Sequence, residues 1–574
     1  MKTLIRSSVL IVLILLTTLR TQAQDIEEKL DAAVEAYFNA RSFIGAVLVA
    51  RGDDVLYEKG FGMADYTWSI PNAPDVRYRI GSVTKQFTAA VILKMVEAGA
   101  VELDAVIRDY IPYYPEPQGS RVTVHQLLNH TSGIPSYTNL AAFGEDIMVR
   151  DMPPDSVLAK VWHLDFEFEP GTDFSYNNSG YFILGVIIEK AASMSYEKAL
   201  QTYLFEPLAL ENSGLEKNSV VTPRLAEGYR RSPLGWDRAA YMSTTWPFAA
   251  GMMYSTVGDL HRWTRALHTG EVFDSEETYS KMTTPYQQNY GYGLGIRELN
   301  LVDRKIRAIA HSGGINGFTS QCMYLPEDAY TIVVFDNAQG ASQRVADAIV
   351  RVLYDLPLEP VLPSIADEVA RVQMSEGMDE ALERYDALKE EEAEKWDFTE
   401  AQLNLLGYWY LQRGDITEAL AVFKKNIDAY PDASNTYDSM GEGLYEAGRY
   451  EESIEMYRKA LEMNPGSRTA PVMLAKMGVE VEERVVEIAE DVLESYTGKY
   501  ELQPGFVLTV TREGSRMFTQ ATGQQRVEIF PSSQNVFYLK VVEASLTFHG
   551  DGSSPAESVT LHQGGRDMPA KRID

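Results

Sequence analysis

Ser82 and Lys85 stand three residues apart in the run Ser82-Val83-Thr84-Lys85, just ahead of a strongly apolar helical stretch. On a helix this spacing places both side chains on one face, one turn apart. A serine at a helix start lies near free backbone N–H groups, and an amine beside it can take its proton if burial lowers the amine's pKa. The pair alone is also explained by an ordinary helix cap, and Ser195 and Lys198 have the same spacing.

Tyr176 and Asn178 form a second candidate element, directly after the turn signal Pro170-Gly171. A tyrosine beside Lys85 could share a proton, acting first as general base and then as acid to the leaving group. The amide of Asn178 could bind a substrate amide. A packing role remains the alternative for Tyr176, and Tyr137-Thr138-Asn139 repeats the same spacing.

The run His311-Ser312-Gly313-Gly314 is the third element. Glycines on a strand edge allow another backbone or a ligand to approach closely. His311 and Ser312 could then donate hydrogen bonds to a substrate carboxylate or carbonyl. Standing alone, the run would also fit a glycine-rich turn.

The elements around these residues predict one mixed α/β unit over residues 26–356. Residues 45–50 read as a strand that turns at 52–54 into a second strand at 55–57. Residues 87–95 read as a helix ending near Gly99, and residues 330–335 as a central strand. Strands at both ends with helices between them indicate a unit that closes on itself.

Taken together and in this order, the three elements resemble the serine β-lactamase and penicillin-binding superfamily in its class C-like branch. The stretches at 130–134 and 251–263 look similar too, so the resemblance covers about residues 26–356. It implies a β-lactamase-like fold, an acyl-enzyme and no cofactor or metal.

The resemblance also implies a role for each residue. Ser82 would be the acylated nucleophile, with Lys85 and Tyr176 managing its proton. Asn178, His311, Ser312 and Gly313 would bind substrate. The backbone N–H groups of Ser82 and Gly314 would form the oxyanion hole. His130 is expected to organise its loop rather than to take part in catalysis.

Position 311 departs from many β-lactamases, which have lysine there. A histidine is mostly neutral at neutral pH, so it holds a carboxylate less firmly. This favours a peptidase or esterase over antibiotic hydrolysis. If His311 binds carboxylates only when protonated, carboxylate substrates should be favoured at lower pH.

The C-terminal half predicts two further domains. Pro357, Pro360 and Pro363 indicate a semi-rigid linker over 357–365. Residues 366–475 resemble tetratricopeptide repeats, because glycines, aromatics and prolines recur with a period of 34, as in Gly407 and Gly441. Such an array is either a spacer or a groove for a protein partner. Residues 490–574 read as a small all-β barrel or sandwich that resembles a lipocalin-like module.

The N-terminus and the composition complete the analysis. Residues 1–23 have the basic, apolar and small-residue order of a cleaved signal peptide, which predicts a periplasmic or secreted protein without a membrane span after cleavage. The net charge of −30 argues against nucleic-acid binding, and the single cysteine, Cys322, excludes internal disulfides and cysteine-based zinc sites.

These observations predict a serine hydrolase acting on a peptide, a D-amino-acid derivative or an ester. A β-lactamase is the alternative within the class. A catalytically silent binding protein, using the repeats and the β-module, is the alternative outside it.

Overall fold

The computed structural model describes residues 25–574 except 141, 142, 144, 481–485, 487, 504, 505, 523, 525, 543, 551, 564 and 565. The predicted signal segment, residues 1–23, lies outside the described residues. The chain divides into two compact units, Met1–Pro363 and Ser364–Asp574, so the helical repeats and the β-module belong to the same unit. Within the described ranges, no helix is long and apolar enough to cross a membrane.

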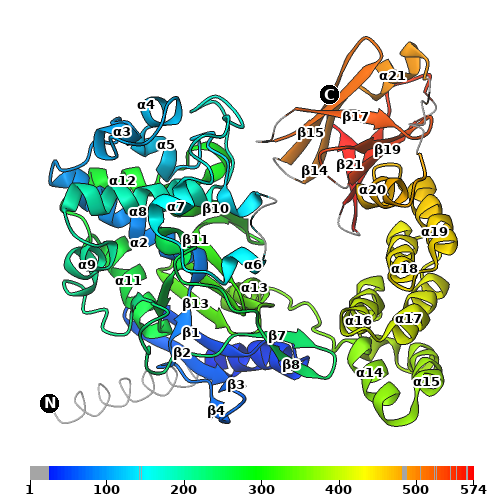
Figure 1. Ribbon diagram of the computed structural model, residues 1–574, viewed down its shortest axis with the longest axis horizontal. Coiled ribbons are helices and arrows are strands. Elements are labelled where there is room, and N and C mark those ends of the chain that lie inside the picture. Colours follow the sequence, from blue (N-terminus) through cyan, green and yellow to red (C-terminus); the bar gives the residue numbers. More distant parts are fainter. Residues whose placement is uncertain are drawn as a thin grey trace, which may run out of the picture. The chain divides into compact units, whose positions relative to one another are not determined.

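A six-stranded antiparallel sheet forms the centre of the first unit (Figure 1). Its central strands join the two ends of the unit, because Val47 on β1 pairs with Val334 on β13. The predicted strands, the turn at Gly52 and the closure of the unit are therefore confirmed. The strands, in sheet order, are β10 (Gly295–Asn300), β11 (Lys305–Ile315), β12 (Phe318–Leu325), β13 (Tyr330–Asp336), β1 (Gly45–Arg51) and β2 (Asp54–Phe61).

Alternate residues of the central strands face two different cores, as the pleat of a strand requires. Val47 and Val49 pack with the helix at residues 25–39 and with α13 (Ser342–Leu353). Ala46 and Leu48 face the larger core instead. That core holds the longer helices of the catalytic side, α2 (Thr84–Glu97), α8 (Asn178–Ala192) and α11 (Val257–Thr269).

Shorter elements connect these parts and carry most of the loops around the site. The helical ones are α3 (Ile107–Tyr110), α4 (Gln118–Arg121), α5 (Val124–Leu128), η2 (Tyr137–Asn139), α6 (Glu145–Met148), α7 (Pro154–Leu158), α9 (Tyr196–Leu200), η3 (Gln201–Phe205), α10 (Phe248–Gly251), α12 (Glu276–Thr283) and η4 (Gln287–Asn289). The strands are β3 (Met63–Asp65), β4 (Ile70–Pro71), β5 (Tyr78–Arg79), β6 (Gly214–Leu215), β7 (Tyr229–Ser232), β8 (Gly235–Arg238) and β9 (Met253–Ser255).

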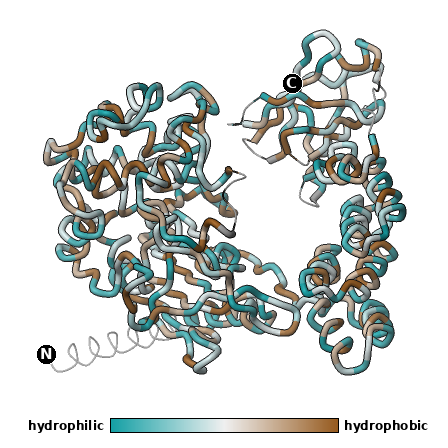
Figure 2. The backbone as a smooth tube through the Cα atoms, in the orientation of Figure 1, coloured by the Kyte–Doolittle hydropathy of each residue, from teal (hydrophilic) through white to brown (hydrophobic). Residues whose placement is uncertain are grey.

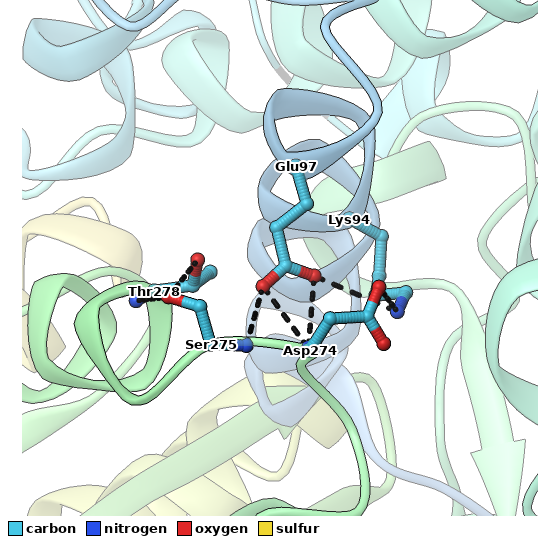
Figure 3. A network of polar contacts seen from close by, with 5 residues as sticks. All are labelled: Lys94, Glu97, Asp274, Ser275 and Thr278. Atoms are coloured by element: carbon cyan, nitrogen blue, oxygen red, sulfur yellow. Dashed lines mark hydrogen bonds and ion pairs between the residues drawn. The ribbon is translucent and has the colours of Figure 1, made fainter.

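The C-terminal end of α2 is tied to the start of α12 by Glu97 (Figure 3). Its carboxylate accepts the backbone N–H groups of Asp274 and Ser275, at 3.0 and 3.1 Å. Ser275 in turn caps α12 by accepting the N–H of Thr278. Lys94 lies 3.5 Å from Glu97 and completes the cluster. This network holds α12, and the segment after it, against the helix that follows Ser82.

Seven helices open the second unit, and their packing confirms the predicted repeat. An added Cβ at Gly407 would lie 2.3 Å from the ring of Phe423, and one at Gly441 would lie 3.0 Å from the ring of Tyr457. Both hydrophobic and hydrophilic residues occur along these helices (Figure 2), and buried hydrophobic side chains form a core between them. The helices are α14 (Ile365–Glu376), α15 (Met378–Glu391), α16 (Glu400–Arg413), α17 (Ile416–Ala429), α18 (Ser434–Glu446), α19 (Tyr450–Met463) and α20 (Thr469–Lys476), and the short turn η5 (Ala393–Lys395) lies between α15 and α16.

The β-module is a closed eight-stranded barrel in which neighbours along the chain pair and β14 pairs with β21. Its interior is filled by side chains, with Tyr496 of α21 (Glu490–Tyr496) stacked on Phe548. A β-barrel is one of the two forms that the sequence predicts for this module. The strands are β14 (Gly498–Gln503), β15 (Phe506–Glu513), β16 (Arg516–Ala521), β17 (Val527–Pro531), β18 (Val536–Leu539), β19 (Ala544–His549), β20 (Ser558–Gln563) and β21 (Arg566–Arg572).

Candidate active site

Ser82 lies in the single turn η1 (Gly81–Val83) that leads into α2, and Lys85 follows in the first turn of that helix. The Nζ atom of Lys85 lies 3.0 Å from the Oγ atom of Ser82. The contact is local in sequence, because residues three apart on a helix share a face. It places an amine within reach of the hydroxyl proton.

Lys85 is fully buried, and its Nζ atom has three oxygen partners. Besides Ser82, these are the Oδ1 atom of Asn178 and the backbone oxygen of Ala250, each at 2.8 Å. Burial lowers the pKa of Lys85 well below its ordinary value. A neutral amine fits the geometry, because it can donate to the two carbonyl oxygens and turn its lone pair to the Ser82 hydroxyl. Lys85 is therefore placed to act as the base.

Tyr176 and Asn178 are positioned by the N-terminal cap of α8. The side chain of Asn177 caps this helix by accepting the N–H of Gly180 at 2.9 Å. The N–H of Asn177 itself donates to the Nδ1 atom of buried His130 at 3.0 Å. His130 thus holds the turn that carries both candidate residues, which is the loop-organising position expected of it.

The phenol of Tyr176 suits a proton donor better than a base. The Nζ atom of Lys85 lies over its ring, 4.9 Å from the centroid. Tyr176 is 38% exposed, yet desolvation raises its pKa above the ordinary value, and a hydrogen bond with Ser82 offsets this only in part. The phenol therefore keeps its proton at neutral pH, and the general-base role that the sequence suggests for it stays a prediction. From this position it could protonate a leaving group.

The backbone around Ser82 packs directly on strand β11. An added Cβ at Gly81, whose φ is +50°, would lie 2.7 Å from the nitrogen of Gly314. One at Gly313 would lie 2.0 Å from the oxygen of Ile80. Only glycine fits this approach at both positions. It brings Ser82 and Gly314 to the wall of the same small pocket, where the resemblance places the oxyanion hole.

His311 lies on β11 with both ring nitrogens engaged by the protein. The Nε2 atom is 2.8 Å from the hydroxyl of Tyr290, and the Nδ1 atom is 2.6 Å from the backbone oxygen of Ser312. Burial lowers the pKa of His311 to about 3. The prediction that His311 binds substrate carboxylates once it is protonated at lower pH stays a prediction, and burial moves that protonation to a lower pH than for an exposed imidazole.

A pocket of about 210 Å³ opens beside Ser82, Asn178 and Gly314. Trp246 lies at its wall, with the ring of Phe143 at 5.0 Å. In the described part of the chain, none of the side chains that line it is charged. The pocket therefore suits an uncharged, apolar group.

The structure brings Ser82, Lys85, Asn178 and Gly314 together, and Tyr176 packs against Lys85. Ser312 is exposed, and its backbone oxygen accepts a hydrogen bond from the Nδ1 atom of His311. The roles assigned to these residues stay predictions, since the contacts show their placement only. Among the described residues, no group of three or more His, Cys, Asp or Glu side chains could hold a metal ion.

The two motifs that repeat the spacings of the candidate residues, at Ser195 and at Tyr137, make other contacts. The Oγ atom of Ser195 caps α9 by accepting the N–H of Lys198, a structural role. Tyr137 lines the pocket, but its hydroxyl donates to the backbone oxygen of Trp246 at 2.6 Å. Thr138 beside it accepts a hydrogen bond from the side chain of Asn178 at 3.1 Å.

Sequence reasoning missed Tyr290 and the backbone oxygen of Ala250. A carbonyl has no sequence signature, so Ala250 could not have been singled out. Tyr290 lies in the glycine-rich run Asn289-Tyr290-Gly291-Tyr292-Gly293, whose close backbone approaches were the available signal. An added Cβ at Gly293 would indeed lie 2.6 Å from the backbone oxygen of Lys85.

Several known proteins are similar to this chain. Penicillin-binding protein 4* of Bacillus subtilis is 25% identical over 96% of this chain and 99% of its own length. A D-aminopeptidase of Gluconobacter oxydans is 27% identical, and the match covers 55% of this chain and 60% of that protein.

Solved structures share the fold. The octameric penicillin-binding protein homologue from Pyrococcus abyssi has a TM-score of 0.51 at 22% identity, over 95% of this chain and 100% of that chain. The D-amino acid amidase from Ochrobactrum anthropi SV3 complexed with L-phenylalanine amide has a TM-score of 0.50 at 22% identity, over 58% of this chain and 99% of that chain.

Three family models match the chain in separate stretches. A tetratricopeptide repeat model matches residues 397–465, which confirms that resemblance, and a domain of unknown function (DUF3471) matches residues 482–572. The Beta-lactamase model matches residues 30–355, more than half of the chain and the whole stretch that carries the candidate site. The chain therefore belongs to the beta-lactamase family of serine hydrolases.

Proposed function

We propose that the protein cleaves amide or ester bonds of short peptides or D-amino-acid derivatives through an acyl-enzyme at Ser82. The contact of 3.0 Å between the Nζ atom of Lys85 and the Oγ atom of Ser82 carries this proposal. Buried Lys85 takes the hydroxyl proton as Ser82 attacks the carbonyl carbon, and the N–H groups of Ser82 and Gly314 stabilise the oxyanion. The proton then passes to the leaving group, and water releases the acyl group in a second such step.

The acyl side of the substrate is uncharged and apolar in this proposal. The pocket beside Ser82 measures about 210 Å³. That is smaller than the roughly 300–1,000 Å³ of pockets that enclose a drug-sized ligand, so it suits one side chain or a short acyl group. The names of two similar proteins, a D-aminopeptidase and a D-amino acid amidase, support amide substrates of this size.

Hydrolysis of β-lactams is the second candidate, favoured by the family and by the similarity to Penicillin-binding protein 4*. The neutral state of His311 weighs against it, because β-lactams carry a carboxylate. The intact contact between Ser82 and Lys85 likewise weighs against a catalytically silent binding protein.

The other parts of the chain have proposed roles as well. We infer export to the periplasm or the medium from the order of residues 1–23. Phe423 and Tyr457 are fully buried between helices of the repeats, which supports a packing role for these side chains. A protein partner for the repeats stays a prediction.

Intact-mass analysis after exposure to a fluorophosphonate probe, and separately to penicillin, tests the proposed function. We expect one fluorophosphonate adduct in the wild type and none in Ser82→Ala, and turnover of D-phenylalanine amide that the same substitution abolishes. Labelling that persists in Ser82→Ala would contradict the assignment. Catalytic conversion of penicillin to its hydrolysis product, abolished in Ser82→Ala, would favour the second candidate. Ser195→Ala is the matched control, because Ser195 has the same spacing to a lysine but caps α9.

A further inference from the structure

The hydrogen bonds of His311 define the state of its ring. The backbone oxygen of Ser312 can only accept, so the Nδ1 atom at 2.6 Å carries the hydrogen. The Nε2 atom then holds a lone pair, and the hydroxyl of Tyr290 donates to it at 2.8 Å. His311 is thus a neutral ring with no free donor.

Tyr290 is held in place by its own packing. It is 7% exposed and lies between η4 and β10. Its ring centroid lies 4.6 Å from that of His130 and 6.1 Å from that of Tyr176. The hydroxyl of Tyr290 has Tyr181 as a hydrogen-bond partner besides His311, and the packed aromatic cluster leaves its ring little freedom to turn away from both.

The groups that face His311 leave no cation for a substrate carboxylate. Lys85 approaches from α2, and Tyr176, His130 and Tyr290 approach from the loops. The tyrosines are uncharged, and burial lowers the pKa of His130 well below its ordinary value. The amine of Lys85 is engaged by three oxygen partners. Within the described part of the site, His311 is the one remaining group that could become a positively charged donor.

We propose that Tyr290 is a specificity-determining residue: by donating to the Nε2 atom of His311, it withdraws the ring from the substrate and makes the site prefer substrates without a carboxylate next to the scissile bond. The proposal rests on the proposed hydrolysis at Ser82. It assigns His311 to a pair with Tyr290 rather than to substrate binding.

Tyr290→Phe tests the proposal, because it removes only the donating hydroxyl. The lone pair of Nε2 then has no donor, which favours protonation and raises the pKa of His311 above its wild-type value, although the ring stays buried. The substrates are the butyrate esters of 3-hydroxybenzoic acid and of 3-hydroxybenzamide, which differ only by a carboxylate in the leaving group. The measured quantity is the ratio of their kcat/KM values, acid over amide, from about pH 5 to 8.

In the wild type we expect this ratio to stay constant over that range. In Tyr290→Phe it should rise about tenfold towards the acid end, as the imidazolium forms a charge-assisted hydrogen bond to the carboxylate. The double variant Tyr290→Phe with His311→Gln should return to a constant ratio. Tyr292→Phe is the matched control. Tyr292 lies in the same loop as Tyr290, and its hydroxyl is likewise bonded to a histidine, 2.6 Å from the Nδ1 atom of His125, but not to His311.

Nuclear magnetic resonance of the histidine rings provides a readout that does not need activity. The midpoint of the His311 titration should lie at a higher pH in Tyr290→Phe than in the wild type, where burial keeps the ring neutral between about pH 5 and 8. Titration of His311 in the wild type, or an unchanged ratio in folded Tyr290→Phe, would overturn the proposal. If the fluorophosphonate probe does not label Ser82 in the wild type, the proposed function is wrong. The titration of His311 would still test its hydrogen bond with Tyr290.

Discussion

Replacing Gly81 with alanine should damage the oxyanion hole while leaving Ser82 and Lys85 in place. The new Cβ atom would lie 2.7 Å from the nitrogen of Gly314 and 3.0 Å from its oxygen. An ordinary contact needs about 3.4 Å, so the backbone at Gly314 must retreat by roughly 0.7 Å. A misplacement of about 1 Å costs on the order of 10²-fold in rate, and we expect that loss in kcat/KM.

Gly81→Ala should also lower the stability of the protein, and a control variant separates this effect from the loss of kcat/KM. Gly81 has a φ of +50°, and a side chain in this left-handed region costs roughly 1–2 kcal/mol. Gly99 at the other end of α2 has a φ of +71°, and an added Cβ there would meet no atom within 4 Å. Gly99→Ala should therefore lose a similar amount of stability but keep its kcat/KM.

The assay combines thermal unfolding with the rate of Ser82 acylation by a p-nitrophenyl ester. The expected pattern is a lower Tm in both variants and a slower acylation in Gly81→Ala only. A folded Gly81→Ala with wild-type acylation would refute the reasoning, because the contact between Gly81 and Gly314 would then have no part in aligning the oxyanion donors. Equal rate losses in both variants would refute it too, since they would point to backbone strain alone.

Two further predictions concern the base and the helical repeats. Burial lowers the pKa of Lys85, so its amine is neutral at a lower pH than that of an exposed lysine, and acylation should be lost as the pH falls through that pKa. Lys85→Arg keeps its charge, so it should reduce kcat/KM by about 10²- to 10⁴-fold and remove this acid limb from the pH profile. Glycine to alanine within a helix normally stabilises it by about 1 kcal/mol. At Gly407 the new Cβ would lie 2.3 Å from the ring of Phe423, so we expect Gly407→Ala to destabilise the protein by roughly 1–3 kcal/mol in urea unfolding of the full chain. Acylation of Ser82 should stay unchanged. A stabilised Gly407→Ala, or an unchanged pH limb in Lys85→Arg, would contradict these two expectations.

The sequence was most informative where a contact depends on local geometry. The contact of Ser82 with Lys85 follows from a spacing of three on one helix, and the contact of Gly407 with Phe423 follows from a repeat of two antiparallel helices. Both could be predicted because the chemistry and the geometry lie in the same short stretch. The closure of the first unit by β1 and β13 was predictable for a related reason, since two apolar runs at its ends needed partners.

Contacts between distant residues were less accessible. The strand β21 reads as a polar segment with a proline, Arg566–Arg572, and it is a strand because it closes the barrel between β20 and β14. His311 was recognised by its type and place, but its state depends on which atoms meet each ring nitrogen. Tyr290 meets one of them from 21 residues away. The sequence around His311 therefore does not show which atoms bond to its ring nitrogens.

The neutrality of the site has a consequence for substrate choice that the charge of the whole chain reinforces. The chain carries a net charge of −30, which disfavours the approach of anions over distances up to about 10 Å at ordinary ionic strength. A site that binds anions would need a local cation to offset this field. Lys85 is instead committed to Ser82, Asn178 and Ala250, and His311 to Tyr290 and Ser312. Long-range and local electrostatics therefore act in the same direction, towards neutral amides and esters.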